Sequence, residues 1–147
     1  MQPIYDIETF RPSQAVGAFI GQARRTIVEA IDQKLAPLDI SHAQWFVVML
    51  LGDGTAATAA ELCKLVVYNP GAMTRLLDRL EKKGVLRRVR IRGDRRSVRL
   101  ELTAEGRRLY PRILQALVEV FNRLLRGFSE RDVRQLEDLL KRMVANA

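Results

Sequence analysis

The stretch from Arg90 to Leu100, RIRGDRRSVRL, contains five arginines among eleven residues. Guanidinium groups stay charged at neutral pH and form bidentate hydrogen bonds with phosphates and with the edge of guanine. The same composition also suits a hairpin whose charges are simply solvated. The placement of the arginines, and of the elements around them, must therefore decide between a solvated surface and one that binds a polyanion.

The excess positive charge of the chain is confined to one quarter of its length. Residues 64–99 contain twelve Lys/Arg and three Asp/Glu, a net charge of +9, whereas the other 111 residues carry thirteen basic and fourteen acidic side chains. Such a localised cluster is typical of a surface that binds nucleic acid. An anionic membrane surface and a merely soluble surface are the alternatives.

Residues for other kinds of chemistry are sparse. One histidine, His42, and one cysteine, Cys63, are too few for a tetrahedral metal site. The sequence shows no Ser/His/Asp or Cys/His set with supporting context and no glycine-rich phosphate loop, so we expect neither an enzyme nor a cofactor. Cys63 shares a helix face with small apolar residues, which favours a small buried hydrophobic residue over a redox centre.

Three features favour a protein of the cytoplasm. A single cysteine excludes an internal disulfide framework and suits a reducing compartment. The N-terminal residues MQPIYDIETFRPS carry acids and a proline, unlike an export signal. No run approaches the roughly 18 uninterrupted apolar residues of a membrane span, so we expect no membrane partner.

Six segments with apolar residues at helical spacing position the basic residues. Capping residues and prolines predict where these helices begin, at Ser13, Ser41, Thr58, Asn69-Pro70, Thr103 and Ser129. Pro111 lies within the fifth segment and either kinks that helix or marks its true start. The predicted fold class is mainly α with one small β-hairpin.

The hairpin is predicted because the period changes from 3.6 to 2 after Gly84. Val89 and Ile91 alternate with arginines before Gly93-Asp94, and Val98, Leu100 and Leu102 alternate with charged residues after it. We expect a β-hairpin over residues 85–102, called the wing below. Its apolar residues would face inward and its arginines, Arg88, Arg90 and Arg92 among them, outward.

The helix over residues 70–83 directly precedes the wing and has two distinct faces. Met73, Leu76, Leu77 and Leu80 follow core spacing. The opposite face carries Gly71, Arg75, Asp78 and Lys82, with Thr74 and Arg79 on its flanks. Small residues in the first turn allow close approach to bases, Arg75 can bond guanine, and Thr74 can contact a thymine methyl or a phosphate. The alternative is a solvated helix whose charges pair along its own face.

The short helix over 58–67 and this helix are separated by two residues, close to the spacing of a helix-turn-helix. Followed by a basic hairpin, the pair forms a winged helix. In that arrangement the helix enters the major groove of DNA and the wing reaches a minor groove, where negative potential favours arginine.

The sequence resembles the MarR family of bacterial transcriptional regulators. The resemblance runs over nearly the whole chain and is carried by LDISHAQW (38–45), AAELC (59–63), NPGAMTRLLDRLEKKG (69–84) and GDRRSVRLELTAEG (93–106). It implies a homodimer that binds a pseudo-palindromic DNA operator. It also implies a winged-helix region over 41–102, with recognition helix 70–83, and dimerisation helices over 13–36 and 104–146.

The family pattern assigns roles in the wing. Asp94 would orient Arg96 into the minor groove, with Arg95 beside it, while Arg90 and Arg92 would contact phosphates. The full set of expected DNA-binding residues is Asn69, Pro70, Gly71, Thr74, Arg75, Arg79, Arg90, Arg92, Asp94, Arg95 and Arg96.

Many members of the family release DNA when a small, often aromatic or phenolic molecule binds. The resemblance therefore implies a ligand-responsive repressor, with candidate ligand contacts at Phe19, His42, Trp45, Met49 and Tyr110. Trp45 and Met49 equally suit a hydrophobic core, and His42 suits an exposed place in the first turn of its helix. The alternatives are a winged helix that binds DNA constitutively, or one that binds RNA or protein without a small-molecule effector.

Overall fold

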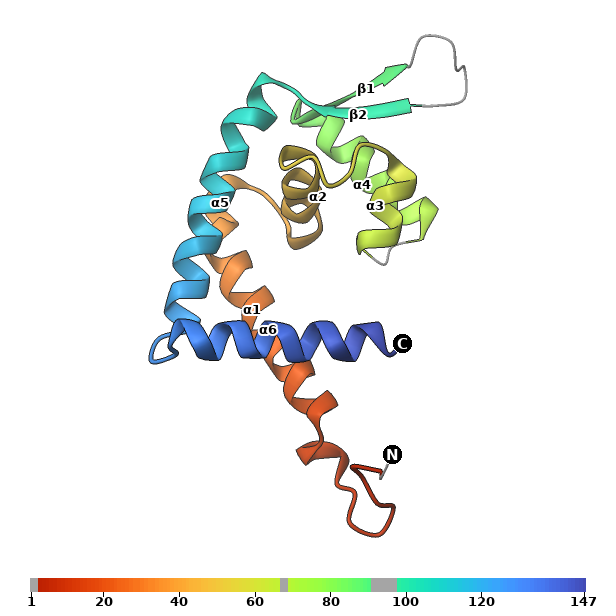
Figure 1. Ribbon diagram of the computed structural model, residues 1–147. Coiled ribbons are helices and arrows are strands. Elements are labelled where there is room, and N and C mark those ends of the chain that lie inside the picture. The colour runs from red at the N-terminus through yellow and green to blue at the C-terminus, as the bar shows by residue number, and fades with distance from the viewer. Residues whose placement is uncertain (1–2, 67–68, 91–97) are drawn as a thin grey trace.

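The computed structural model describes residues 3–66, 69–90 and 98–147. Its elements, in chain order, are η1 (Pro12–Gln14), α1 (Val16–Leu35), η2 (Ala36–Leu38), α2 (His42–Gly52), α3 (Ala59–Val66), α4 (Pro70–Lys82), β1 (Leu86–Arg90), β2 (Val98–Leu102), α5 (Ala104–Leu124) and α6 (Glu130–Ala145). Helices dominate, and the two strands form one antiparallel sheet (Figure 1). The predicted fold class is confirmed.

Most helices begin where their capping residues predict. The Asn69 side-chain oxygen accepts a hydrogen bond from the Ala72 amide at 2.8 Å, which satisfies a free N–H of α4. At α6, the Ser129 hydroxyl oxygen accepts from the Asp132 amide and the Asp132 carboxylate accepts from the Ser129 amide, at 3.2 and 2.8 Å. These side-chain contacts fix where each helix starts and therefore which residues face the core.

The first long helix departs from the prediction. Ser13 does not cap it, because Pro12–Gln14 form a separate 3₁₀ turn and Ala15 is extended, so that α1 begins at Val16. In α5, by contrast, the helix runs from Ala104 through Pro111 to Leu124, so Pro111 does not mark its start. No single described helix has the length and apolarity of a membrane span, and α1 and α2 reach that standard only together, as a pair bent by 83°.

The core lies where the C-terminal half of α1 meets α2, α4, α5 and the strands. Its fully buried large side chains are Ile31, Leu35, Val47, Val48, Leu62, Met73, Leu77, Leu80, Leu86 and Ile113. With Leu100 and Leu102 of β2, which are also buried, each α-helix from α1 to α5 and both strands contribute to this cluster. Helix α4 and the two strands are thus anchored to the rest of the structure by their apolar residues.

The last helix stands apart from this core. In Figure 1, α6 crosses α1 in the lower half of the molecule, away from the wing. None of its residues is buried, and Leu136, Leu139, Leu140 and Met143 on its apolar face are 38–50% exposed. The rest of the described chain therefore leaves this face uncovered.

Candidate nucleic-acid interface

Helix α4 presents two faces, as predicted. Met73, Leu76, Leu77 and Leu80 are buried, whereas Asn69, Pro70, Gly71, Thr74, Arg75 and Arg79 are exposed. The Thr74 hydroxyl donates to the Pro70 carbonyl at 2.9 Å, which turns its proton back onto its own helix. The N-terminal end of α4 therefore offers a slim, cationic surface to solvent, of the kind that fits a major groove.

The charges on α4 do not pair along the helix. Within residues 3–66, 69–90 and 98–147, no carboxylate lies within ion-pair distance of Arg75, Arg79 or Lys82. Asp78, the acid expected to neutralise this face, pairs with an arginine of β1 instead. The alternative of a solvated helix with internally paired charges therefore does not describe α4.

The register of the wing corrects the prediction for its first strand. Leu86 pairs with Leu102, Arg88 with Leu100 and Arg90 with Val98, and residues directly opposite one another share a face of the sheet. Leu86, Leu100 and Leu102 are buried, so Arg88 and Arg90 lie on the inward face and Val89 on the other. The prediction that Arg88 faces outward was wrong, whereas Arg90, opposite exposed Val98 at the end of the strand, is exposed as predicted.

Arg88 is held between two acids of α4. Its Nη2 lies 2.7 Å from Asp78 Oδ1, its Nη1 pairs with Glu81, and its backbone amide donates to Glu81 Oε1 at 3.2 Å. Partial burial opposes the charged form of this guanidinium, but the hydrogen bonds and charges of both acids outweigh that penalty and raise the pKa of Arg88. Its charge is therefore balanced within the protein.

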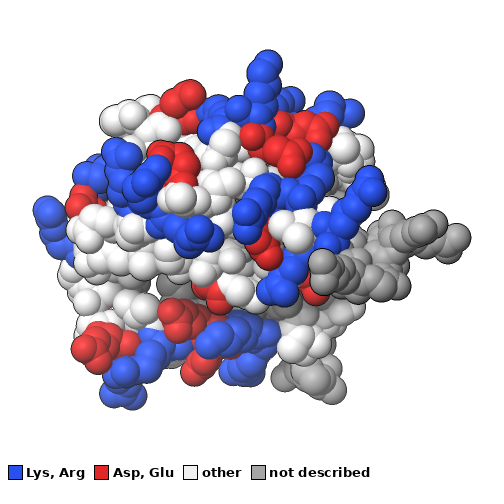
Figure 2. All heavy atoms as spheres, turned by 90° about the horizontal axis from the view of Figure 1, so that it is seen from above, with Lys and Arg blue, Asp and Glu red and all other residues white. Residues whose placement is uncertain are grey.

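The tip of the wing lies outside the described residues. The expected contacts Arg92, Asp94, Arg95 and Arg96 fall there, and their roles stay predictions. Arg90, at the end of β1, is exposed beside this segment. Figure 2, which looks down from above the view of Figure 1, shows basic side chains spread over this side of the molecule with acidic side chains between them.

Three of the five candidate ligand residues come together in a groove of about 1090 Å³. Phe19 of α1 and His42 and Trp45 of α2 line it, together with residues of α3, α5 and α6. Met49 does not, because it packs against the core, and neither does Tyr110, whose ring lies against Gly52. The structure therefore does not bring those two residues together with the other three candidates.

The walls of the groove are apolar with one charged group. Among the described residues that line it, Arg24 alone carries a charge. Helix α6 contributes Leu136, Leu139, Leu140 and Met143, the exposed face noted above. The sequence prediction did not include Arg24 or these residues of α6 in the groove. The apolar stripe of α6, which has little of its own chain to pack against, was the signal that could have indicated them.

His42, Trp45 and Phe46 form an aromatic cluster among the residues that line this groove. The rings of His42 and Trp45 meet edge to face with centroids 5.5 Å apart, and Trp45 meets Phe46 in the same way at 5.3 Å. His42 is half-buried, which corrects the expectation of an exposed position, while Trp45 is buried as its core role predicts. Neither His42 Nδ1 nor Trp45 Nε1 has a hydrogen-bond partner among the described residues.

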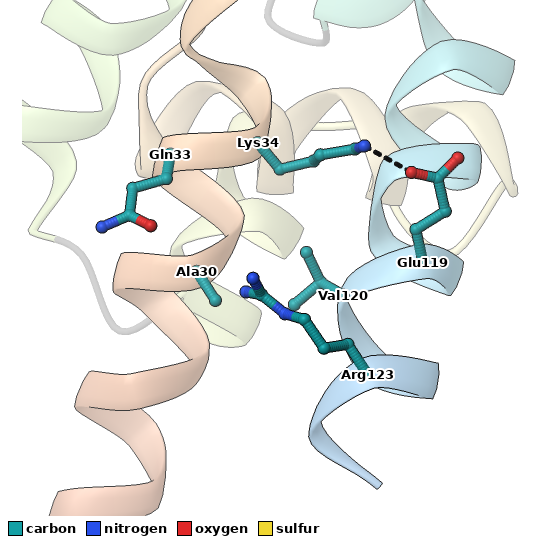
Figure 3. Close-up of a pocket in the computed structure, with 6 residues that line it drawn as sticks. All are labelled: Ala30, Gln33, Lys34, Glu119, Val120 and Arg123. Carbon is teal, nitrogen blue, oxygen red and sulfur yellow. Dashed lines mark ion pairs between the residues drawn. The ribbon is translucent and has the colours of Figure 1, made fainter. Parts of the chain in front are cut away.

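A second, smaller cavity of about 320 Å³ lies between α1 and α5 (Figure 3). Lys34 and Glu119 form an ion pair across it, and the hydrogen bonds from Lys34 and Gln115 lower the pKa of Glu119. Arg123 projects over its apolar floor of Ala30 and Val120. None of the candidate ligand residues lies here.

Cys63, half-buried, packs against the core, in agreement with its predicted hydrophobic role.

Comparison with known proteins agrees with this geometry. The model of the MarR family matches residues 40–98. The HTH-type transcriptional regulator PecS of Dickeya dadantii (strain 3937) is 32% identical over 145 residues, which cover 97% of this chain and 85% of that protein. PecS is a transcriptional regulator and not an enzyme, in accord with the expectation of a non-enzymatic protein.

Two solved structures show what similar chains bind. A mutant MarR from Escherichia coli complexed with operator DNA superposes with a TM-score of 0.80 at 30% identity, over 95% of this chain and 99% of that one. NadR in complex with 4-hydroxyphenylacetate superposes with a TM-score of 0.78 at 27% identity, over 92% and 96%. PecS is similar to this chain over 97% of its residues, and α3, α4, β1 and β2 form a winged helix. The chain therefore belongs to the MarR family of DNA-binding transcriptional regulators.

Proposed function

We propose that this protein is a homodimeric transcriptional repressor located in the cytoplasm. It binds a pseudo-palindromic operator and is released from it by a small aromatic ligand. The observation that carries the proposal is the apolar groove that α1, α2 and α6 share, at the junction of the winged helix with helices that one subunit leaves uncovered. A ligand held there touches both the elements that would join two subunits and the elements that carry α4.

In this proposal the winged-helix region, residues 41–102, contacts DNA. Helix α4 enters the major groove with Asn69, Pro70, Gly71, Thr74, Arg75 and Arg79. The wing follows the backbone with Arg90 and Arg92 and enters the minor groove through Asp94, Arg95 and Arg96. The support for α4 is its exposed N-terminal end and its unpaired cations within the described chain.

The segments over 13–36 and 104–146 form the dimer interface in this proposal. Their exposed apolar side chains support it: Phe19 on α1 is 56% exposed, and Val118 and Phe121 on α5 are 47% and 39% exposed. Phe19 and Phe121 line the same groove as the exposed apolar residues of α6, so these side chains adjoin one another. The exposed apolar residues of a monomer are usually scattered singly. A twofold axis would place the two α4 helices roughly 34 Å apart, one turn of DNA, and would match a pseudo-palindromic sequence.

The ligand is an aromatic compound with an acidic group. Phe19 and Trp45 offer apolar and aromatic walls, and Arg24 is the charge in the groove that an anionic group can pair with. NadR, similar over most of its length, binds 4-hydroxyphenylacetate, which has this chemistry. The groove volume of about 1090 Å³ is near the upper end of the roughly 300–1,000 Å³ of typical ligand sites, so a small aromatic acid fits there.

The test measures release of DNA. A duplex is selected from random-sequence DNA with the purified protein, and binding is followed by fluorescence anisotropy while 4-hydroxyphenylacetate or its neutral amide is added. We expect the acid to release DNA at lower concentration than the amide. Arg24→Gln should raise the concentration for half-release by about tenfold, since a hydrogen bond to a charged group contributes about 1.5–3 kcal/mol.

Arg25→Gln is the matched control, because Arg25 neighbours Arg24 on α1 but does not line the groove. Sedimentation of each variant reports whether the dimer persists. If a panel of aromatic acids and phenols leaves DNA binding of the wild-type protein unchanged, the effector part of the proposal is wrong and the protein regulates constitutively. A monomer at working concentration refutes the dimer.

A further inference from the structure

The wing is joined to the recognition helix by a short turn. Helix α4 ends at Lys82, Gly84 adopts a positive φ of 71°, and the Val85 amide bonds to the Leu80 carbonyl at 3.0 Å before β1 begins at Leu86. This turn fixes where the wing starts. The direction in which the hairpin leaves the helix depends on contacts further along β1.

Arg88 supplies those contacts from two residues inside the strand. Its guanidinium bonds Asp78 at 2.7 Å and pairs with Glu81, and its backbone amide bonds Glu81 at 3.2 Å. Asp78 and Glu81 lie one helical turn apart on α4, so the strand is tied to the helix at two points along the helix axis. We propose that Arg88 is a positioning residue for DNA binding, which sets the angle between the wing and α4.

The charge balance argues against a direct phosphate contact. Arg88 lies on the inward face opposite buried Leu100, and its side chain is 30% exposed. Two carboxylates already accept hydrogen bonds from its two terminal nitrogens. A DNA phosphate that approached the guanidinium would meet their negative charge. Arg88 therefore acts on DNA affinity through the geometry of the wing.

Arg87, its neighbour, provides a matched comparison. It lies on the opposite face of the hairpin, is 63% exposed, and pairs with Glu101 of β2 at 2.9 Å. That ion pair links the two strands to each other and leaves α4 untouched. Loss of Arg87 removes the same charge as loss of Arg88, from the same strand, without loosening the wing from the helix.

The sign of the effect of removing an acid distinguishes the two roles. If Arg88 contacted phosphate, then Asp78→Asn or Glu81→Gln would free its charge and remove repulsion, and DNA binding would tighten. If Arg88 positions the wing, the same substitutions loosen it and binding weakens. The experiment measures the affinity of Asp78→Asn, Glu81→Gln, Arg88→Gln and Arg87→Gln for a duplex selected by the wild-type protein, with the thermal midpoint of each free protein.

At a temperature well below each thermal midpoint, we expect the affinity for DNA to fall about threefold to fivefold in each acid variant. It should fall about tenfold in Arg88→Gln and less than threefold in Arg87→Gln. The double variant Asp78→Asn with Arg88→Gln should bind no more weakly than Arg88→Gln alone, since both remove one contact. Tighter binding by either acid variant overturns the proposal. So does equal loss in Arg87→Gln and Arg88→Gln. The acid variants decide the matter even if Arg88→Gln does not fold.

Discussion

Replacement of Gly106 by alanine would drive a methyl group into the junction between α4 and β1. A Cβ atom built on Gly106 lies 2.1 Å from the Val85 carbonyl oxygen and 3.1 and 3.2 Å from two carbons of the Leu102 side chain. The Val85 oxygen has little room to withdraw, because it accepts a hydrogen bond from the Thr103 amide at 3.0 Å, and the Thr103 hydroxyl, which donates to the Gly84 carbonyl at 2.5 Å, lies 3.2 Å from it. These bonds hold the first turn of α5 against the base of the wing.

The magnitude follows from opposing terms. Inserting a carbon into a filled site costs about 1–3 kcal/mol, and losing one hydrogen bond at the junction costs about 1 kcal/mol more. Alanine recovers about 1 kcal/mol relative to glycine inside a helix. The net loss in the free energy of unfolding is about 1–3 kcal/mol, which lowers the thermal midpoint of a chain of this size by roughly 3–10 °C.

Chemical unfolding followed by circular dichroism, at one fixed protein concentration, measures this loss. Gly71→Ala is the control, because a Cβ atom there meets nothing closer than Asn69 Oδ1 at 3.5 Å. Its free energy of unfolding should stay within about 1 kcal/mol of the wild-type value. A Gly106→Ala protein as stable as the wild type would refute the close-approach argument for this glycine.

Four further predictions concern DNA binding and pH. Gly71→Ala, although stable, should weaken binding to the selected duplex several-fold, because its methyl group lies on the end of α4 that approaches the bases; unchanged anisotropy titrations would contradict this. Arg75→Ala should reduce discrimination against single base changes by about 1–3 kcal/mol, whereas a uniform loss over all sequences would make Arg75 a phosphate contact. Raising salt from about 50 to about 200 mM should weaken binding by about 10³-fold or more, and a nearly flat titration would exclude an interface built on phosphate contacts. Hydrogen bonds from the Ser129 hydroxyl and amide lower the pKa of Asp132 below 3.8, so the capping contact stabilises the protein above that pH and is lost as pH falls through the folded-state pKa. The stability difference between wild type and Asp132→Asn should therefore shrink with acidification below pH 3.8, and a difference independent of pH would oppose this reading.

Helix boundaries were readable from sequence wherever a side chain closes the first turn. Asn69, Thr103 and Ser129 each accept the backbone bond that their positions predict. Ser13 failed as a start because Ala15, two residues later, is extended and separates a 3₁₀ turn from α1. Local hydrogen bonding thus carries most of the information about where these helices begin.

The faces of β1 were not readable in the same way. Valine and arginine alternate there, and alternation defines two faces without stating which one faces the core. The register of Leu86 with Leu102 decides it, and that register depends on pairing across the wing. The groove was missed in part for a related reason: Phe19, His42 and Leu139 line one groove only because α1, α2 and α6 converge in space.

In the proposed dimer, the uncovered face of α6 would also make the lifetime of the regulator depend on its concentration. In the proposed dimer, the second subunit binds only the folded form, so the melting temperature should rise with protein concentration. A newly made chain that has found no partner leaves Leu139, 50% exposed, and its neighbours open to proteases. Proteases would then remove mainly the subunits that have no partner. The amount of assembled dimer would be set by degradation as well as by synthesis.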